Sequence, residues 1–459
     1  MFSIIAIKEW HMVWRNYTVA ITLLSALVLS GIAAAGSRLL YRQEQQQREA
    51  ANRQFRQQWE LLRADDPHSA AHFGTYIFKP LTPLSRFDSG LEPFTGNAMR
   101  IEAHVQHTMA TPPLTPADVY LRFGALTPAT VLQLFFPLLL FFLCFNSYTQ
   151  EKTSGTLRLQ LIQGATLRSI LRGKALLYLV IMAAMLLLSM LLYFPMMTTS
   201  GALPHILLLV VSYGSYAGIF VMLGLWLSTV ARHAGQSLLL LCGIWLCWHI
   251  LLPRLAAATG EALYPLPSQP AIQEKIDQAI KTGIDGNDPR DARTARLEQA
   301  VLQQYKVSSP EQLPVNFDAI RLQADEDYAQ RVYEKYGAKI DSLVRLQNNV
   351  QHYLVLADPY LAIRSISMAL CGTDYAHQYH FNQAAVQYRN MFIRRLNNAM
   401  AYGGEQGRSL YRQMPAFHYE PPATAQVLRG QWLPALSLLL WLIISISLLN
   451  RSAKHASIQ

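Results

Sequence analysis

Six apolar runs, several of them long enough to cross a lipid bilayer, constrain this chain of 459 residues more than any other feature. A transmembrane helix needs about 20 mostly apolar residues, because the hydrocarbon core is roughly 30 Å thick and a helix rises about 1.5 Å per residue. The runs predict transmembrane helices over 17–37, 128–147, 175–197, 205–231, 235–254 and 431–450. Charged residues make up 15% of the chain, whereas soluble domains carry about a quarter. The sequence therefore predicts an α-helical polytopic membrane protein.

The first run has two interpretations. It follows a polar start that contains Lys8, Glu9 and Arg15, and three alanines at 33–35 imitate the cleavage site of a secretory signal peptide. Against this, the apolar stretch is longer than the roughly 7–15 residues of a signal core. We therefore expect an uncleaved membrane anchor.

Basic residues in the short loops predict how the spans are oriented. Short cytoplasmic loops carry an excess of Lys and Arg, whereas long segments translocate largely regardless of charge. One side carries Lys8, Arg15, Lys152, Arg158, Arg168, Arg172, Lys174, Arg232, Arg451 and Lys454, and the opposite hairpin, 198–204, has no basic residue. We expect a multi-pass protein of the bacterial inner (cytoplasmic) membrane, with both termini, the 148–174 loop and the 451–459 tail cytoplasmic. The net charge of +10 is explained in the same way, so nucleic acid is not an expected partner.

Two long polar segments, 38–127 and 255–429, are then extracytoplasmic insertions. The first is expected to be small and mixed: a helical stalk over 42–63 continues the first span, and 78–116 is dense in Pro, Gly and Phe, which is typical of irregular chain or short strands. The second is expected to be larger and mostly helical, with helices over 270–282, 288–306, 317–336, 338–356 and 376–402.

The predicted span interiors contain no Asp, Glu, Lys or Arg. Carriers driven by protons or sodium usually place such residues at membrane depth, where a charge is tolerated only for function. An ion-coupled transporter is therefore disfavoured. The polar exceptions, Gln133, Asn146 and His249, are interpreted as partners in hydrogen bonds between helices.

The 148–174 loop has two interpretations as well. Leu157, Leu161 and Ile162 recur at helical spacing, which is compatible with a short amphipathic helix along the membrane surface, with Glu151 near its positive N-terminal end. From the periodicity alone, a solvated charged loop that carries interfacial leucines is the favoured interpretation.

The loop also resembles a known family. The segment Gln150-Glu151-Lys152-x-x-Gly155-Thr156-Leu157, followed by Arg172-Gly173-Lys174, is similar to the coupling-helix region of type-two ABC exporter permeases. That resemblance implies contacts to an ATPase subunit from Glu151, Gly155 and Thr156, beside Lys152 and Leu157. Gly173 and Lys174 would begin the next span. Many relatives have a second acidic residue where this chain has Thr153.

The N-terminal segment 1–16 resembles the elbow helix that precedes the first span in the same permeases. An apolar stripe with two tryptophans, Trp10 and Trp14, suits an interfacial helix. The resemblance to the elbow helix depends on the pairs Lys8-Glu9 and Arg15-Asn16. Farther on, segment 358–374 and the His380-Phe381 and Tyr388-Arg389 pairs resemble the outer region of an ABC permease subfamily assigned to a domain of unknown function.

The resemblance implies that ATP and Mg²⁺ bind to a separate chain. A phosphate-binding loop ends in Gly-Lys-Ser/Thr, whereas Gly173-Lys174 is followed by Ala175. We expect no cofactor and no catalytic residue here, two copies of an ABC ATPase, a second permease (identical or related), membrane lipid, and a periplasmic partner at the outer domains. The resemblance identifies no substrate.

Metal ligands are not expected. The four cysteines lack paired spacings, and three of them fall inside apolar runs. Three histidine pairs have helical spacing, namely His68 and His72, His104 and His107, and His377 and His380. A zinc site needs at least a third ligand, so these pairs are interpreted as solvated or hydrogen-bonded surface groups.

Three functions remain open. The leading hypothesis is the membrane subunit of an ATP-driven exporter. The second is a mechanotransmission device, in which the ATPase drives work by the outer domains without transport. The third is a passive scaffold or receptor.

Overall fold

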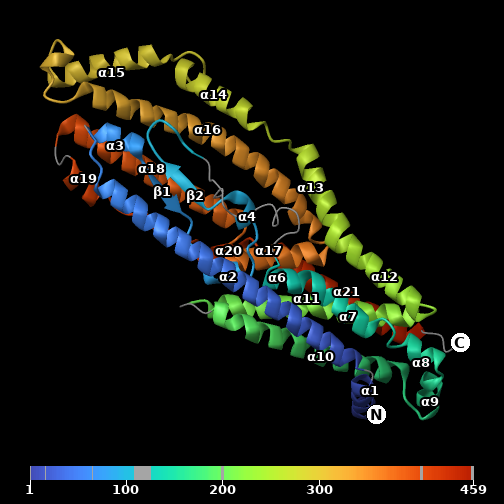
Figure 1. Cartoon of the computed structure of the whole chain (residues 1–459). Helices are drawn as coiled ribbons and strands as arrows, with labels where there is room; N and C mark the ends of the chain where they lie inside the picture. The colour runs from blue at the N-terminus through green and yellow to red at the C-terminus, as the bar shows by residue number, and fades with distance from the viewer. Residues whose placement is uncertain are drawn as a thin grey trace.

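The computed structural model describes residues 2–15, 17–64, 66–107, 126–197, 201–403 and 407–455, with only the backbone for 2–4, 6, 13–15, 454 and 455. The molecule is elongated, and the membrane part and the polar domain follow one another along its length (Figure 1). Both termini lie at the end farthest from the polar domain, which we call the loop end.

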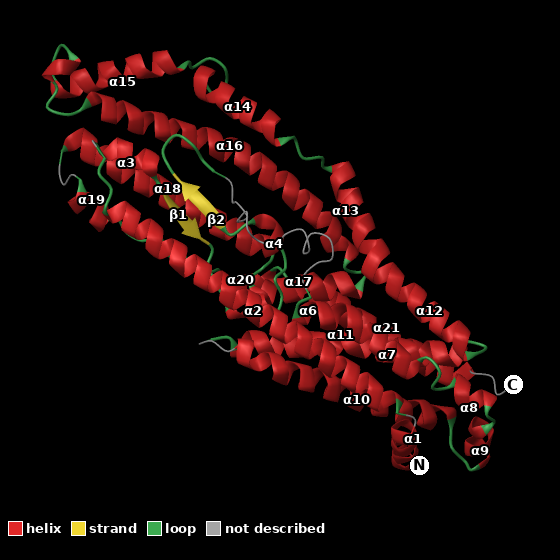
Figure 2. Cartoon of the chain, viewed as in Figure 1, coloured by secondary structure: helices red, strands yellow, loops and turns green. Residues whose placement is uncertain are grey.

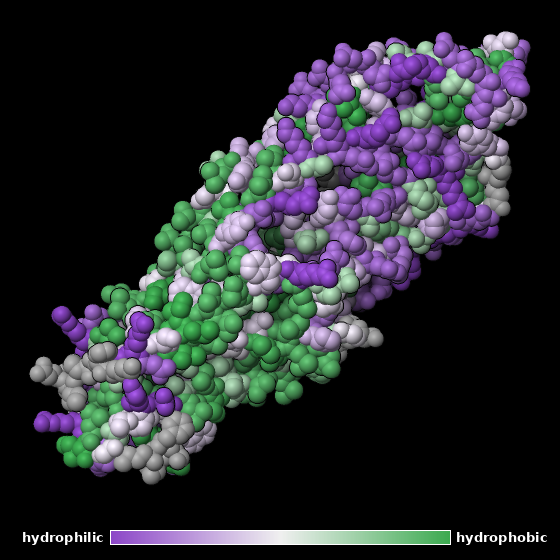
Figure 3. Space-filling model, turned by 180° about the vertical axis from the view of Figure 1, so that it is seen from behind, coloured by the Kyte–Doolittle hydropathy of each residue, from purple (hydrophilic) through white to green (hydrophobic). Residues whose placement is uncertain are grey.

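Within the described residues, six helices are long and apolar enough to cross a membrane, which confirms the predicted α-helical membrane protein. The corresponding elements are α2 (Thr18–Glu60), the run α6 (Pro128–Thr130), η2 (Val131–Phe135), α7 (Phe136–Cys144) and α8 (Thr149–Thr153), then α10 (Leu167–Met197), α11 (Leu203–Val230), the run α12 (Ala234–Leu246), η3 (Cys247–Leu251) and α13 (Leu252–Leu263), and α21 (Trp432–His455). Their exposed apolar side chains form a continuous band beside the polar domain (Figure 3).

Several spans run beyond their predicted ends. α2 continues past the first predicted span to Glu60, which agrees with the predicted helical stalk over 42–63, because this Gln-, Arg- and Ala-rich stretch favours helix and contains no proline. Pairs four residues apart, such as Arg48 with Glu44 and Arg56 with Glu60, add support. α10 begins at Leu167 rather than near 175, so Lys174 lies inside the helix.

α11 is the central helix of the membrane part and packs against α21, α10, α7 and α17 (Pro359–Cys371). Its close approach to α7 depends on Gly224, where an added Cβ would lie 2.7 Å from the Cβ of Cys144. A larger residue at this position would push the two helices apart.

The polar domain is mostly helical (Figure 2). Its elements are α3 (Pro67–Phe73), β1 (Thr75–Phe78), η1 (Pro83–Arg86), α4 (Glu92–Thr95), β2 (Ala98–Ile101), α14 (Gln269–Thr282), α15 (Arg290–Tyr305), η4 (Pro310–Gln312), α16 (Phe317–Leu354), α17, α18 (Tyr375–Tyr402), α19 (Arg408–Gln413) and α20 (Thr424–Arg429). The strands pair antiparallel, from Thr75 opposite Ile101 to Phe78 opposite Ala98. Part of the predicted irregular stretch, residues 108–125, lies outside the described residues.

The helices of the polar domain follow the predicted pattern with one correction. Predicted helices over 270–282, 288–306 and 376–402 match α14, α15 and α18. The predicted pair 317–336 and 338–356 is wrong, because α16 is one continuous helix through Gly337. α16 packs against α13 on the membrane side and α18 within the domain, and this packing outweighs the weak helix preference of one glycine.

Candidate functional site

Three elements meet at the loop end: α1 (Phe2–Arg15), the pair α8 and α9 (Thr156–Ile162), and the first turns of α10. α1 packs along α10, and α8 packs on α9 (Figure 1). The sequence segments predicted as an elbow helix and as a coupling loop are therefore neighbours in space.

A cluster of four charges joins these elements. The Lys174 amine lies 2.8 Å from Glu9 Oε2 and 3.2 Å from Glu151 Oε1. The Lys8 amine lies 2.7 Å from the same Glu151 oxygen and 3.1 Å from Glu9 Oε1. Two ammonium groups thus bridge two carboxylates, one from α1 and one from α8. We call these four residues the ion cluster.

Burial makes the ion cluster energetically demanding. The side chains of Lys174, Glu9 and Glu151 are 1%, 2% and 5% exposed. Charges removed from water in this way are stable only when they are paired, because the desolvation penalty is several kcal/mol for each ion. Burial alone lowers the pKa of Lys8, but its hydrogen bond to Glu151 and the nearby charge of Glu9 outweigh this effect and raise that pKa above its usual value. Lys8 therefore stays charged at neutral pH.

The turn after α8 corrects the predicted single amphipathic helix. Gly155 has a φ of +73°, a conformation that residues with a Cβ rarely adopt, and it separates α8 from α9. Glu151 therefore lies in a different helix from Leu157. α8 is fixed to the end of α11, because the backbone N–H of Tyr148 donates to Ser228 Oγ at 2.9 Å.

The remaining predicted coupling residues divide into buried and exposed groups. Leu157 is 2% exposed within the membrane core, Gly173 is buried in α10, and Lys152 is half-buried. The exposed surface of the turn and of α9 consists of Thr153, Ser154, Gly155, Thr156, Arg158, Leu159 and Ile162. We call this set the α9 face.

The elbow residues are placed as follows. Lys8 and Glu9 belong to the ion cluster, and Trp10 is 42% exposed. Trp14 and Arg15 lie in α1, but their side chains fall outside the described part of the chain. Sequence reasoning found the members of the ion cluster by resemblance, and it did not foresee that they pair with one another or that Ser228 anchors α8.

A second polar network lies where the spans approach the polar domain. Gln133 donates to Tyr213 OH at 2.8 Å, and Tyr213 donates to Ser367 Oγ at 2.9 Å. Ser367 in turn donates to a carboxylate oxygen of Asp88 at 2.5 Å. The network thus ties η2, α11, α17 and the loop before α4 together.

His249 extends this network in η3. Its Nε2 lies 2.8 Å from Tyr216 OH, so Gln133 and His249 both join helices as expected. Asn146 differs from the expectation, because it bonds to Gln150 four residues later. Gln133 and His249 both sit in π-helical turns, which often mark functional positions.

Asp358 at the start of α17 predicts a dependence of stability on pH. Its side chain is fully buried and caps Tyr360 N–H, and Oδ2 has no hydrogen-bond partner among the described residues. Burial raises the pKa of Asp358 from 3.8 to about 7. The folded chain then binds more protons than the unfolded chain between these values, so stability falls as pH rises through this window.

We expect Asp358→Asn to remove this decline and to raise the unfolding temperature at pH 8, since asparagine keeps the capping oxygen. Thermal unfolding of the detergent-solubilised chain between pH 5 and 8 measures the effect. Asp66→Asn, at the solvated cap of α3, is the control and should leave the pH profile unchanged. A pH profile of Asp358→Asn equal to that of wild type would contradict the assignment.

A cavity with a volume of about 710 Å³ lies between α16, α17, α18 and α20. Its lining combines charged groups, such as Arg345, Arg364 and Asp341, with apolar ones, such as Leu361 and Met368. It lies at the border between the polar domain and the membrane part.

A comparison with known families finds one match in the polar domain. Residues 272–420, about a third of the chain, match the family described as "Domain of unknown function (DUF3526)". The matched region contains most of α14 and all of α15 to α19. No curated protein matches the chain.

Proposed function

We propose that this chain is the membrane subunit of an ATP-driven ABC transporter and that it binds its ATPase through the α9 face. The observation that carries the proposal is the ion cluster, which fixes α8 and α1 to α10 and leaves the α9 face projecting at the loop end. A force applied to α9 would reach α1, α10 and α11 through contacts that are buried and paired. Domains of the DUF3526 family often occur in ABC-permease-like proteins, which supports the same proposal.

The α9 face has the composition of a docking surface. Leu159 and Ile162 are 60% and 74% exposed, and they lie on a short helix beyond the apolar band. Apolar side chains at the centre of a polar rim are the usual anchors of a protein interface. Thr153, Ser154 and Arg158 provide such a rim.

We expect Leu159→Asp and Ile162→Asp each to reduce co-purification of the ATPase by at least tenfold, which corresponds to about 1.4 kcal/mol. Folding should not change, because both side chains are exposed. Leu61→Asp is a matched control, since Leu61 is 62% exposed at the far end of α2. Normal ATPase binding by both α9 variants would exclude the α9 face as the docking surface.

A second candidate function is mechanotransmission, and the continuity of the helices favours it. α2 runs from the membrane part into the polar domain as one helix of 43 residues. The run from α12 through η3 to α13 does the same and packs against α16. A change in the tilt of either span would therefore move the polar domain directly. ATP-dependent transport of a substrate by vesicles that contain the complex would count against this second function.

The proposed orientation places the α9 face in the cytoplasm and the polar domain outside. In sealed cells, a membrane-impermeant thiol reagent should label Asp285→Cys, which is 88% exposed, and should not label Ser154→Cys. Both variants are made in a chain whose four native cysteines are replaced by alanine. Labelling of Ser154→Cys in sealed cells, with none at Asp285→Cys, would reverse the orientation.

A further inference from the structure

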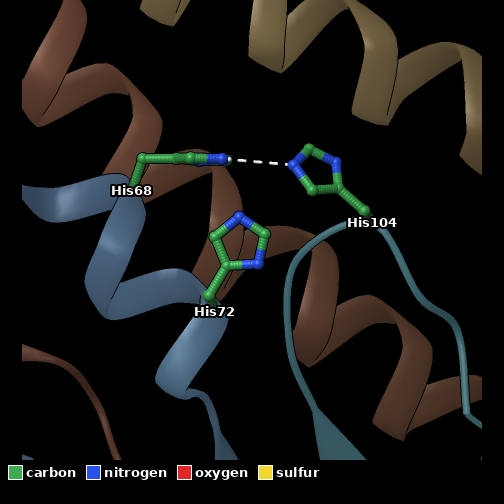
Figure 4. Close-up of side chains that lie close together, drawn as sticks. All are labelled: His68, His72 and His104. Atoms are coloured by element: carbon green, nitrogen blue, oxygen red, sulfur yellow. Dashed lines mark hydrogen bonds between the residues drawn. The ribbon is translucent and has the colours of Figure 1, made fainter.

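Three histidines from the first polar segment converge on the surface of the polar domain. His68 and His72 project from α3, and His104 follows β2 (Figure 4). One nitrogen from each ring lies within 4.8 Å of the others, and His72 and His104 are exposed. The sequence pairs His104 with His107 by spacing, whereas the fold brings His104 to the other pair and supplies the third ligand that the pair lacked.

Hydrogen bonds fix the tautomer of His68. Asp327 can only accept, so Gln323 turns its amide nitrogen to Asp327 Oδ1 at 2.8 Å and its oxygen toward Asn397. Asn397 Nδ2 donates to that oxygen at 3.0 Å, which leaves Asn397 Oδ1 3.0 Å from His68 Nδ1. His68 Nδ1 must therefore carry a hydrogen, and Nε2 of the neutral ring carries a lone pair.

A carboxylate fixes His104 in the same way. His104 Nδ1 lies 2.9 Å from Glu326 Oε1, and Glu326 is buried and paired with Arg389 at 2.9 Å. An ionised carboxylate only accepts, so Nδ1 carries the hydrogen, and Nε2 of the neutral ring again carries a lone pair. A histidine that donates its second nitrogen to a carboxylate or amide oxygen is the arrangement found behind metal ligands.

The two lone pairs face each other. His68 Nε2 and His104 Nε2 are 3.1 Å apart, a distance at which two acceptors repel unless a cation lies between them. A tetrahedral zinc ion with Zn–N bonds of about 2.0–2.1 Å holds its nitrogens roughly 3.4 Å apart. The pair is thus already near the spacing of zinc ligands, and a nitrogen of the exposed His72 ring lies within 4.8 Å of both.

We propose that His68, His72 and His104 bind one divalent transition-metal ion of the zinc class, with Asn397 and Glu326 as orienting residues. Three neutral imidazoles suit zinc and its neighbours rather than magnesium or calcium, which prefer oxygen ligands. The fourth position faces solvent and is open to water or to an external ligand. Because Glu326 lies in α16 and Asn397 in α18, the ion fastens α3 and the chain after β2 to the larger part of the polar domain.

The test uses the full chain, purified in detergent through a tag without histidine and stripped with a chelator. Titration with Zn²⁺ against a chromophoric chelator should show one high-affinity ion per wild-type chain, and Co²⁺ should give the visible absorption of a tetrahedral site. His72→Ala should lose both signals without unfolding, since its ring is exposed and forms no hydrogen bond within the described part of the chain. Glu326→Gln should bind Zn²⁺ about 10–100-fold more weakly.

His107→Ala is the matched control, because His107 bonds to Glu102 and not to the cluster. It should bind Zn²⁺ as wild type does. Zn²⁺ should also raise the unfolding temperature of wild type and of His107→Ala but not of His72→Ala. If wild type binds no Zn²⁺ at micromolar concentration, or if His72→Ala binds it equally well, the proposal fails. The result is independent of whether the chain docks an ATPase.

Discussion

Replacing Lys174 by methionine is expected to lower the free energy of unfolding by about 3–5 kcal/mol, the usual cost of leaving a buried charge without its partner. Lys174 is 1% exposed and contacts both Glu9 and Glu151. In the variant two buried carboxylates would face each other with Lys8 alone between them. Thermal or denaturant unfolding of the detergent-solubilised chain measures the loss, and release of α1 from α10 should make the N-terminus sensitive to protease.

A second variant separates the charge effect from the loss of a side chain. Glu9→Gln combined with Lys174→Met leaves Lys8 and Glu151 as a neutral pair, so much of the lost stability should return. Lys152→Met is the control, because Lys152 is half-buried and outside the ion cluster. If Lys174→Met is as stable as Lys152→Met, the ion cluster does not hold the elbow helix in place.

Trp59→Ala, near the C-terminal end of α2, is expected to lower the free energy of unfolding by a similar amount. Trp59 is 2% exposed, donates its Nε1–H to the carbonyl of Tyr411 at 2.9 Å, and packs on the ring of Phe392. Truncation of a buried tryptophan costs about 3–5 kcal/mol. Here the loss would detach the end of the stalk from α18 and α19.

This variant also discriminates between the two proposed functions. Mechanotransmission requires the stalk to be attached, so Trp59→Ala should abolish cellular function while the α9 face still retains the ATPase. Unfolding of the purified chain, ATPase co-purification and a growth assay measure the three quantities. Leu61→Ala, two residues later and exposed, should change none of them. Full function of Trp59→Ala, despite a measured loss of stability, would argue against force transmission through α2.

The spans and most outer helices are properties of the sequence alone. Residues 205–231 were predicted and α11 covers Leu203–Val230, because crossing a membrane requires only a sufficient run of apolar neighbours. The prediction over 270–282 and α14 agree for a similar reason, since helical periodicity is visible within a dozen residues. The break predicted within α16 was wrong, because a glycine such as Gly337 weakens a helix locally but does not show whether tertiary packing keeps the helix continuous.

The sites depend on contacts between residues far apart in the chain. Lys8, Glu9, Glu151 and Lys174 were each singled out by resemblance, but only the packing of α1 on α10 and the hydrogen bond that joins the start of α8 to α11 bring them together. His104 was paired with a neighbour three residues away, and its actual partners lie 32 and 36 positions earlier. The sequence determined which segments are helical and apolar, since local backbone and solvent preferences decide both. The tertiary structure alone decided which charges and imidazoles meet, because that depends on the path of the whole chain.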